Sequence, residues 1–338
     1  MARELQAEPD TPPNTRPRRR YETTKSLHYP RPDYQRPLLT LAAEVREGFV
    51  RRLTALYGEA AARQWMPELE RICRVYYAHK PTGMIARERD FDPLERFSEE
   101  DVILITYGDL IRGNDPSPLA TLSKFCGLQL GRTVNTLHIL PFYPYSSDRG
   151  FSVVDFETVD PGLGTWQDLE AIETRYQLMF DGVINHVSSQ SRWFQEFLAG
   201  NPRYRGFFTS FSAPDELTQE QRSLIFRPRT TDVLTVYPSL DGPRHVWTTF
   251  SADQIDLNYQ DPEVLMRVLE ILLLYVRRGA DIIRLDAVTF LWIRPGTPCV
   301  HLAETHEVVK LFRDVLRVVA PHVALVTETN VPHAENVA

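Results

Sequence analysis

Five short segments that are expected to be strands, the first of them a nearly continuous apolar run, constrain the fold of this chain more than any other feature. They lie at residues 102–107, 133–140, 177–184, 281–286 and 322–327. A strand that is apolar at successive positions is buried on both faces, as in a parallel sheet covered by helices. Helix-forming segments lie between or beside these runs, at residues 118–125, 165–176, 263–278 and 305–319. This alternation predicts a parallel α/β fold.

The remaining segments divide the chain into further parts. Residues 1–35 are rich in Pro and Arg, and we expect them to be disordered. Apolar residues then recur at helical spacing from Leu39 to Tyr76, which predicts a helical extension over 36–100. Barrel segments are expected at 101–186 and 251–338. Residues 187–250 break the rhythm with aromatic and Pro-rich stretches, and we interpret them as an inserted subdomain.

Composition excludes several classes of function. Of the 338 residues, 43% are hydrophobic and 25% charged, with a net charge of −7, as expected for a globular protein that binds no nucleic acid. Apolar runs of roughly 18 residues, which a membrane span needs, do not occur. The odd set of Cys73, Cys126 and Cys299 has no zinc-site or disulfide spacing, which favours a reducing cytoplasm. We expect no metal and no cofactor.

Ionisable residues gather where three of the predicted strands end. In barrels, functional side chains sit at the carboxyl ends of strands. Here His186 follows the third strand, Arg284 and Asp286 end the fourth, and Glu328 follows the fifth. Side chains of a strand alternate with period two, so Arg284 and Asp286 share a face. A nearby cation lowers the pKa of a carboxyl, and we therefore expect Asp286 to be ionised.

Two carboxylates on neighbouring strands suit one reaction class in particular. Carboxyl groups about 5 Å apart permit double displacement at a glycosidic carbon with retention of configuration. Asp286 would attack, and Glu328 would move the proton. Each residue alone could instead cap a helix or anchor a loop, so the combination carries this interpretation.

Four motifs together resemble glycoside hydrolase family 13, the α-amylase superfamily. They are Asp181 to His186, Gln254 to Asn258, Ile283 to Val288 and Thr327 to Asn330. The resemblance covers roughly residues 100–338. It implies a (β/α)8 barrel, and five of its eight strands lie in this sequence.

The resemblance also implies roles for individual residues. It implies Asp286 as the nucleophile and Glu328 as the acid/base. His186 and Arg284 would bind the glucosyl unit at the cleaved bond. Asp148 would bind the outer hydroxyl groups of the same glucose. These five residues are joined by Phe151, which would line the same pocket, and by Asp181 and Asn185, which would act as framework.

Further motifs look like the sucrose phosphorylase branch of this family. They are Leu140 to Asp148, Gly296 to Cys299 and Phe226 to Arg229. In that branch an arginine of the last motif helps to bind phosphate, and Arg229 is our first choice, with Arg227 beside it. Guanidinium groups match phosphate oxygens. Motifs such as Trp247 to Phe250 look closest to the subgroup that acts on 2-O-α-glucosylglycerate.

The expected partners are therefore an α-glucoside (of the glucosylglycerate or sucrose type) and inorganic phosphate. The family's last three strands and its third carboxylate are not reached, so we expect a partial barrel that is inactive or nearly so by itself. Two alternatives stay open. One is an α-glucoside hydrolase or transglucosidase with the same carboxylates, and the other is an inactive barrel fragment. The sequence does not indicate an oligomeric state.

Overall fold

The structure is a computed structural model that describes residues 32–33, 35–80, 82–89, 91–131 and 133–329. The expected disordered tail lies almost wholly outside the described residues. Asn330, the last residue of the fourth motif, also lies outside them.

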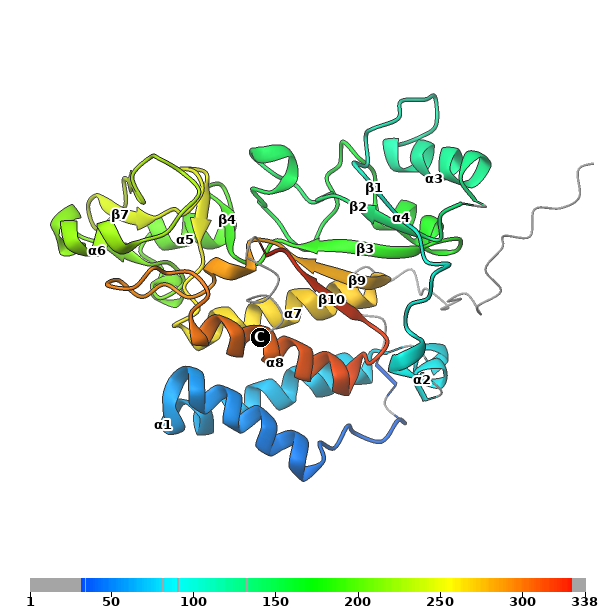
Figure 1. The fold of residues 1–338 in the computed structure, drawn as a ribbon, viewed down its shortest axis with the longest axis horizontal. Coiled ribbons are helices and arrows are strands. Elements are labelled where there is room, and N and C mark those ends of the chain that lie inside the picture. Colours follow the sequence, from blue (N-terminus) through cyan, green and yellow to red (C-terminus); the bar gives the residue numbers. More distant parts are fainter. Residues whose placement is uncertain (1–31, 34, 81, 90, 132, 330–338) are drawn as a thin grey trace, which may run out of the picture.

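A five-stranded parallel sheet forms the centre of the molecule (Figure 1). Its strands are β1 (Ile103–Thr106), β2 (Thr136–Ile139), β3 (Gln177–Gly182), β9 (Ala280–Leu285) and β10 (Ala324–Thr327). They lie in the order β1-β2-β3-β9-β10, and every neighbouring pair is parallel. The predicted parallel α/β fold is confirmed, as are all five predicted strands.

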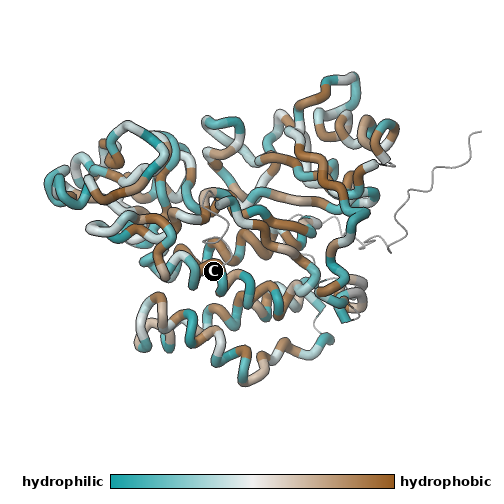
Figure 2. Tube along the Cα trace, in the orientation of Figure 1, coloured by the Kyte–Doolittle hydropathy of each residue, from teal (hydrophilic) through white to brown (hydrophobic). Residues whose placement is uncertain are grey.

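Helices connect the strands of this sheet. They are α3 (Pro118–Gln129), α4 (Trp166–Glu173), α7 (Pro262–Arg277) and α8 (Ala303–Val319). Figure 1 shows α7 and α8 together below the sheet, while α3 and α4 lie near β1 and β2. Most of α7 is buried, which explains its nearly continuous apolar sequence. Figure 2 shows the same pattern, with hydrophobic segments along the sheet and these helices.

A glycine allows the tight turn from α7 into β9. Gly279 has a φ of +98°, in the left-handed region where a side chain is strained. A Cβ atom added there would lie 2.7 Å from the Glu173 carboxyl carbon. The turn therefore requires glycine, and it delivers the chain directly into the strand that carries Arg284.

The N-terminal extension packs against the outer helices. It consists of α1 (Ala43–Ala78), α2 (Thr82–Arg89) and the short 3-10 turn η1 (Pro93–Glu95). α1 is interrupted at Gly58, where φ is +79°. Arg52 on α1 pairs with Glu307 and Asp314 on α8, at 2.8 and 3.1 Å. The extension is thus part of the molecular core.

A separate cluster of short elements interrupts the barrel between β3 and α7. It contains β4 (His186–Ser188), α5 (Arg192–Leu198), β5 (Ser210–Phe211), α6 (Gln219–Leu224), β6 (Leu234–Tyr237), β7 (Arg244–Trp247), β8 (Gln254–Asp256), and the turns η3 (Pro202–Tyr204) and η4 (Pro214–Glu216). β5, β7 and β6 form an antiparallel sheet, and β4 pairs with β8. Figure 1 shows this group to one side of the central sheet. The boundaries of the inserted subdomain, at residues 187 and 250, stay a prediction.

The central sheet is open at both edges. A TIM barrel closes with eight strands, whereas this sheet has five, with β1 and β10 outermost. Ile105 on β1 and Val326 on β10 are 61% and 41% exposed, although both are apolar. The sheet therefore has the form of a partial barrel. Among the described residues, no helix combines the length and apolar character needed to cross a bilayer.

Candidate active site

One guanidinium group holds three carboxylates at the carboxyl ends of β3, β9 and β10. Arg284 Nη1 donates to Asp181 Oδ1 at 2.5 Å and to Asp286 Oδ1 at 3.1 Å. Its Nη2 lies 3.2 Å from Glu328 Oε1. The sequence prediction that Arg284 and Asp286 share a face is confirmed, while Leu285 between them is fully buried on the other side.

Backbone hydrogen bonds fix the two predicted reacting carboxylates relative to each other. The Asp286 amide donates to Gly182 O at 3.0 Å, and the Glu328 amide donates to Leu285 O at 3.0 Å. Glu328 Oε2 also accepts from the Ala287 amide at 2.9 Å. The parallel ladder thus continues past the strand ends and keeps Glu328 opposite Asp286.

A buried histidine on β2 contacts the carboxylate cluster through Asp181. Asp181 is fully buried, and its second oxygen, Oδ2, lies 2.8 Å from His138 Nε2 on β2. This contact agrees with Asp181 as a framework residue. Sequence reasoning missed His138, although an ionisable residue inside an apolar run is a usable signal, because such a residue needs a buried partner.

The expected lowering of the Asp286 pKa by Arg284 is not what the structure gives. Burial raises the pKa of Asp286 well above its usual value, and the neighbouring charge of Glu328 and a hydrogen bond with it raise it further. Arg284 lowers the pKa but does not outweigh burial. The physical reason is that one cation is divided among three acids in a site with little water. The Asp286 carboxyl therefore holds a proton more tightly than the carboxyl of a free aspartate does.

Among the residues that the structure describes, no group of three His, Cys, Asp or Glu side chains is arranged to hold a metal ion.

His186 lies buried beside the loop that carries Asp148 and Phe151. Burial lowers the pKa of His186 to about 4, so its ring is neutral near pH 7. Its Nε2 lies 2.8 Å from the Phe151 carbonyl oxygen and donates to it, and Asn185 Nδ2 can donate to its Nδ1 at 3.3 Å. Gln254 Nε2 donates to Asp148 Oδ2 at 3.0 Å. The Phe151 ring lies 5.8 Å from the Arg284 guanidinium carbon, so these residues adjoin the carboxylate cluster.

The loop around Asp148 has an unusual backbone. Asp148 and Arg149 have φ values of 53° and 49°, and Gly150 has 107°. These residues form the turn η2 (Asp148–Gly150). A Cβ atom at Gly150 would lie 2.5 Å from the Pro141 carbonyl oxygen, so glycine alone fits. The surroundings must hold this loop in place, because left-handed backbone at non-glycine residues costs free energy.

Asp253 provides this support, and sequence reasoning missed it. Its Oδ2 accepts from Ser146 Oγ and Ser147 Oγ, both at 2.5 Å, and from Ser152 Oγ at 3.0 Å. Its Oδ1 accepts from Ser189 Oγ at 2.5 Å. Burial raises the pKa of Asp253, but these hydroxyl donors outweigh it and hold the pKa below its usual value. The pairs Ser146-Ser147 and Ser188-Ser189 were a signal in the sequence.

The two predicted phosphate ligands differ in their surroundings. Arg227 donates to the carbonyl oxygens of Thr249 at 3.0 Å, Thr248 at 3.1 Å and Thr231. Arg229 donates only to its neighbour Pro228 O, at 2.9 Å, among the described residues. Arg227 therefore supports the backbone, whereas Arg229 keeps donors available.

Arg229 also lies near the sugar-binding candidates. Its guanidinium carbon is 5.9 Å from the centre of the Phe250 ring, and that ring is 5.4 Å from the His186 ring. Phe290, in the turn η5 (Val288–Phe290) after Asp286, packs on Phe250 at 5.3 Å. Aromatic rings thus connect Arg229 to both His186 and the segment after β9.

Comparison with known families agrees with this geometry. Residues 129–338 match the family described as "Alpha amylase, catalytic domain". The glucosylglycerate phosphorylase of Allomeiothermus silvanus is 48% identical over 299 residues, which cover 88% of this chain and 51% of that protein. The glucosylglycerate phosphorylase of Escherichia coli is 45% identical over 245 residues, covering 72% and 43%.

The fold is also similar to that of a solved phosphorylase structure. The crystal structure of sucrose 6F-phosphate phosphorylase from Thermoanaerobacter thermosaccharolyticum superposes with a TM-score of 0.62 at 27% identity, covering 69% of this chain and 48% of that one. The chain spans about half the length of the curated relatives it matches.

Proposed function

The chain belongs to the family of α-amylase catalytic domains, and from this membership we propose that it carries the glucosyl-binding part of a retaining α-glucosyl phosphorylase. The observation that carries the proposal is the convergence of Asp286 and Glu328, from neighbouring strands, on one Arg284 guanidinium. Two carboxyl groups held this way can act on one anomeric carbon.

In the first step, the Asp286 carboxylate attacks C1 of the glucosyl unit while Glu328 donates its proton to the departing oxygen. In the second step, a phosphate oxygen attacks C1 of the glucosyl ester, and Glu328 accepts the proton from phosphate. Asp286 is then released, and the product is α-glucose 1-phosphate. Each step inverts C1, so the configuration is retained overall.

The raised pKa of Asp286 fits this scheme if the pair holds one proton. Asp286 and Glu328 both contact the Arg284 guanidinium, and in this scheme the proton passes from Asp286 to Glu328. After transfer, Asp286 is the nucleophile and Glu328 the acid. The neutral His186, Arg284 and Asp148 would bind the hydroxyl groups of the glucose, and Phe151 would line the same pocket.

We assign phosphate binding to Arg229 and a supporting role to Arg227. Arg227 is engaged by three carbonyl oxygens, while Arg229 has donors left for an anion. The names of the two relatives favour 2-O-α-glucosylglycerate as the donor over sucrose.

Product formation tests this proposal directly. The native protein that contains this chain is supplied with 2-O-α-glucosylglycerate, or with sucrose, and glucose 1-phosphate and free glucose are measured with and without phosphate. We expect glucose 1-phosphate only with phosphate, and a higher rate with glucosylglycerate. Arg229→Gln should raise KM for phosphate by about tenfold or more, which corresponds to ~1.4 kcal/mol, whereas the surface control Arg192→Gln should not.

Two outcomes would contradict it. Free glucose at an equal rate without phosphate would indicate a hydrolase or transglucosidase with the same carboxylates. No product from either donor would favour the inactive-fragment alternative.

We also propose a cytoplasmic location. Cys73, Cys126 and Cys299 are all buried free thiols in the structure, which suits a reducing compartment.

A further inference from the structure

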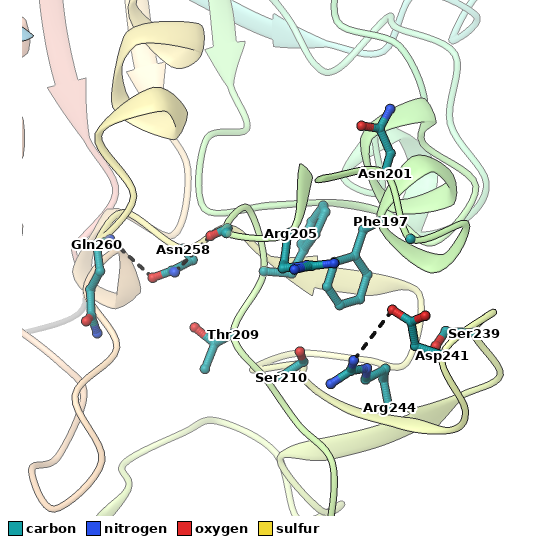
Figure 3. Close-up of a pocket in the computed structure, with 13 residues that line it drawn as sticks. Phe197, Asn201, Arg205, Thr209, Ser210, Ser239, Asp241, Arg244, Asn258 and Gln260 are labelled. Carbon is teal, nitrogen blue, oxygen red and sulfur yellow. Dashed lines mark hydrogen bonds and ion pairs between the residues drawn. The ribbon is translucent and has the colours of Figure 1, made fainter. Parts of the chain in front are cut away.

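A cavity lies in the inserted subdomain, and Figure 3 shows the residues that line it. Its volume is about 410 Å³, within the range of small-molecule sites. Residues from α5, β5, β7, the segments on either side of η3 and the segment after β8 line it, and they include Phe197, Arg205, Phe208, Ser210, Arg244 and Asn258.

One wall of the cavity is aromatic. Phe197 and Phe208 are almost fully buried and pack edge to face, with ring centres 5.3 Å apart. The hydroxyl groups of Thr209 and Ser210 are nearby, and neither makes a side-chain hydrogen bond to another described residue. An apolar wall with a few free polar groups is the usual composition of a site for a small ligand.

Arg205 supplies a cation with no partner among the residues that the structure describes. Three other arginines of this subdomain are paired with acids, whereas Arg227 and Arg229 contact backbone carbonyl oxygens. Arg203 lies 2.9 Å from Glu263, Arg222 lies 2.5 Å from Asp232, and Arg192 lies 3.8 Å from Glu196. Arg205 thus adds a positive charge to the cavity lining that no acid offsets by a direct contact among the described residues.

Arg244 adds a second cation on the other side. Figure 3 shows Arg205 on one side of the cavity and Arg244, with Asp241, on the other. Arg244 is held loosely, because its Nη2 lies 3.9 Å from Asp241 Oδ2 and its Nη1 lies 3.2 Å from Ser212 Oγ. The lining therefore carries two guanidinium groups and one carboxylate, a local excess of positive charge.

We propose that this cavity is a second binding site, specific for a small anionic sugar. Its phosphate or carboxylate group lies between Arg205 and Arg244, where planar guanidinium groups match oxyanion geometry. Its sugar body lies against Phe197 and Phe208, with hydroxyl groups reaching Thr209 and Ser210.

This site does not depend on the proposed catalytic function, because none of its lining residues belongs to the carboxylate cluster. β8 connects the two regions. Gln254, at the start of β8, donates to Asp148, and Asn258, two residues past its end, lines the cavity. Occupancy of the cavity can therefore influence the loop that carries Asp148.

Calorimetric titration of the chain tests the proposal. The probes are glucose 1-phosphate, inorganic phosphate and glycerate, and the background variant Arg229→Gln removes the phosphate site proposed above. In that background we expect glucose 1-phosphate to bind, about tenfold more weakly after Arg205→Gln and nearly normally after Arg205→Lys. Arg192→Gln, an exposed arginine outside the cavity, is the matched control.

The three probes separate the sources of the anion. Tighter binding of glucose 1-phosphate than of phosphate supports a sugar body against the aromatic wall, and tighter binding of glycerate supports a carboxylate ligand. The proposal is overturned if none of the probes binds in the Arg229→Gln background, or if Arg205→Gln binds as Arg192→Gln does. Equal thermal melting curves of the two variants establish that Arg205→Gln is folded.

Discussion

Asp286 shows how burial and charge compete at a single residue. Arg284 touches it at 3.1 Å, yet the pKa of Asp286 is raised, because burial and Glu328 act against the cation. A carboxyl group whose pKa is higher in the folded state than in the unfolded state destabilises the fold once it must ionise. The nucleophile proposed here is thus held in place at a cost in stability.

Asp286→Asn should therefore stabilise the protein while it removes activity. Above the ordinary aspartate pKa of about 4, the unfolded chain loses this proton and the folded wild type resists doing so. We expect the variant to melt a few degrees higher than wild type at pH 7, with the difference vanishing as the pH falls below about 4. Turnover should fall by about 10⁴-fold or more. A lower melting temperature at pH 7 would show that the contact with Arg284 outweighs burial.

Asp253→Ala should loosen the loop that carries Asp148. Hydrogen bonds to a charged acceptor contribute about 1.5–3 kcal/mol each, and five serine hydroxyls donate to this carboxylate. Hydrogen exchange over residues 146–152 and 188–189 should become at least about tenfold faster. Asp215→Ala, at an exposed position, is the control. Unchanged exchange in those two segments would exclude this role for Asp253.

Residue roles were only partly predictable from the sequence. The two-residue spacing of Arg284 and Asp286 was enough to predict their contact, because strand geometry is local. The contacts of His138 and Asp253 join segments far apart in the chain. The pKa of Asp286 depends on burial and on how the Arg284 guanidinium is shared among three carboxylates. The spacing of residues in the sequence carries no information on either.

At the scale of elements, the pair β4 and β8 links the subdomain to the barrel. His186 and Asp256 face each other in this ladder. Burial raises the pKa of Asp256 to about 7, although Thr249 donates to both of its oxygens at 2.6 Å and Asn185 donates at 3.2 Å. This junction therefore changes its protonation near neutral pH.

The stability of the junction should fall as the pH rises from about 4 to about 7. Over that interval the unfolded chain releases the Asp256 proton while the folded chain keeps it, so the free energy of unfolding decreases with pH. Asp256→Asn cannot titrate. The melting temperature of the variant minus that of wild type should therefore increase over this interval, on top of a constant offset from altered hydrogen bonds. A difference independent of pH would contradict the raised pKa.

The elements of the barrel were easier to predict than those of the subdomain. Each of the five strands carries a short apolar stretch next to a helical segment, and this pattern predicted all five, including β1 and β10, which are partly exposed. The subdomain strands have two to four residues and depend on contacts between distant segments, so 187–250 could be recognised only as a break in rhythm.

At the scale of the whole molecule, α1 forms an outer layer over the helices α7 and α8. Phe49, Leu53 and Leu69 on α1 are almost completely buried in the main core. Tyr57 on α1 also donates to Tyr259 O at 2.9 Å, next to the segment after β8. The extension predicted from helical periodicity is therefore integral to the fold. Its docking partners were not predictable, because periodicity identifies an apolar face but not what covers it.

Leu53→Ala should destabilise the molecule by about 2–5 kcal/mol, because it leaves a cavity at a fully buried position. The matched control is Arg63→Ala on the same helix. Arg63 forms an exposed ion pair with Glu59 at 3.4 Å, and its loss should cost less than about 1 kcal/mol. Urea unfolding measures both. Equal effects of the two variants would mean that α1 is not part of the cooperative core.

Trapping of a glucosyl ester is the most direct test of the central claim, that Asp286 bonds to the anomeric carbon while Glu328 moves the proton. α-Glucosyl fluoride needs no acid to release its leaving group. The Glu328→Gln variant of the native protein should therefore be glucosylated, and its glucosyl ester should break down only slowly. Peptide mass spectrometry should then find one glucosyl unit on Asp286. Fluoride release with the sugar on a different residue, or with no covalent sugar even after rapid quenching, would contradict the proposed mechanism.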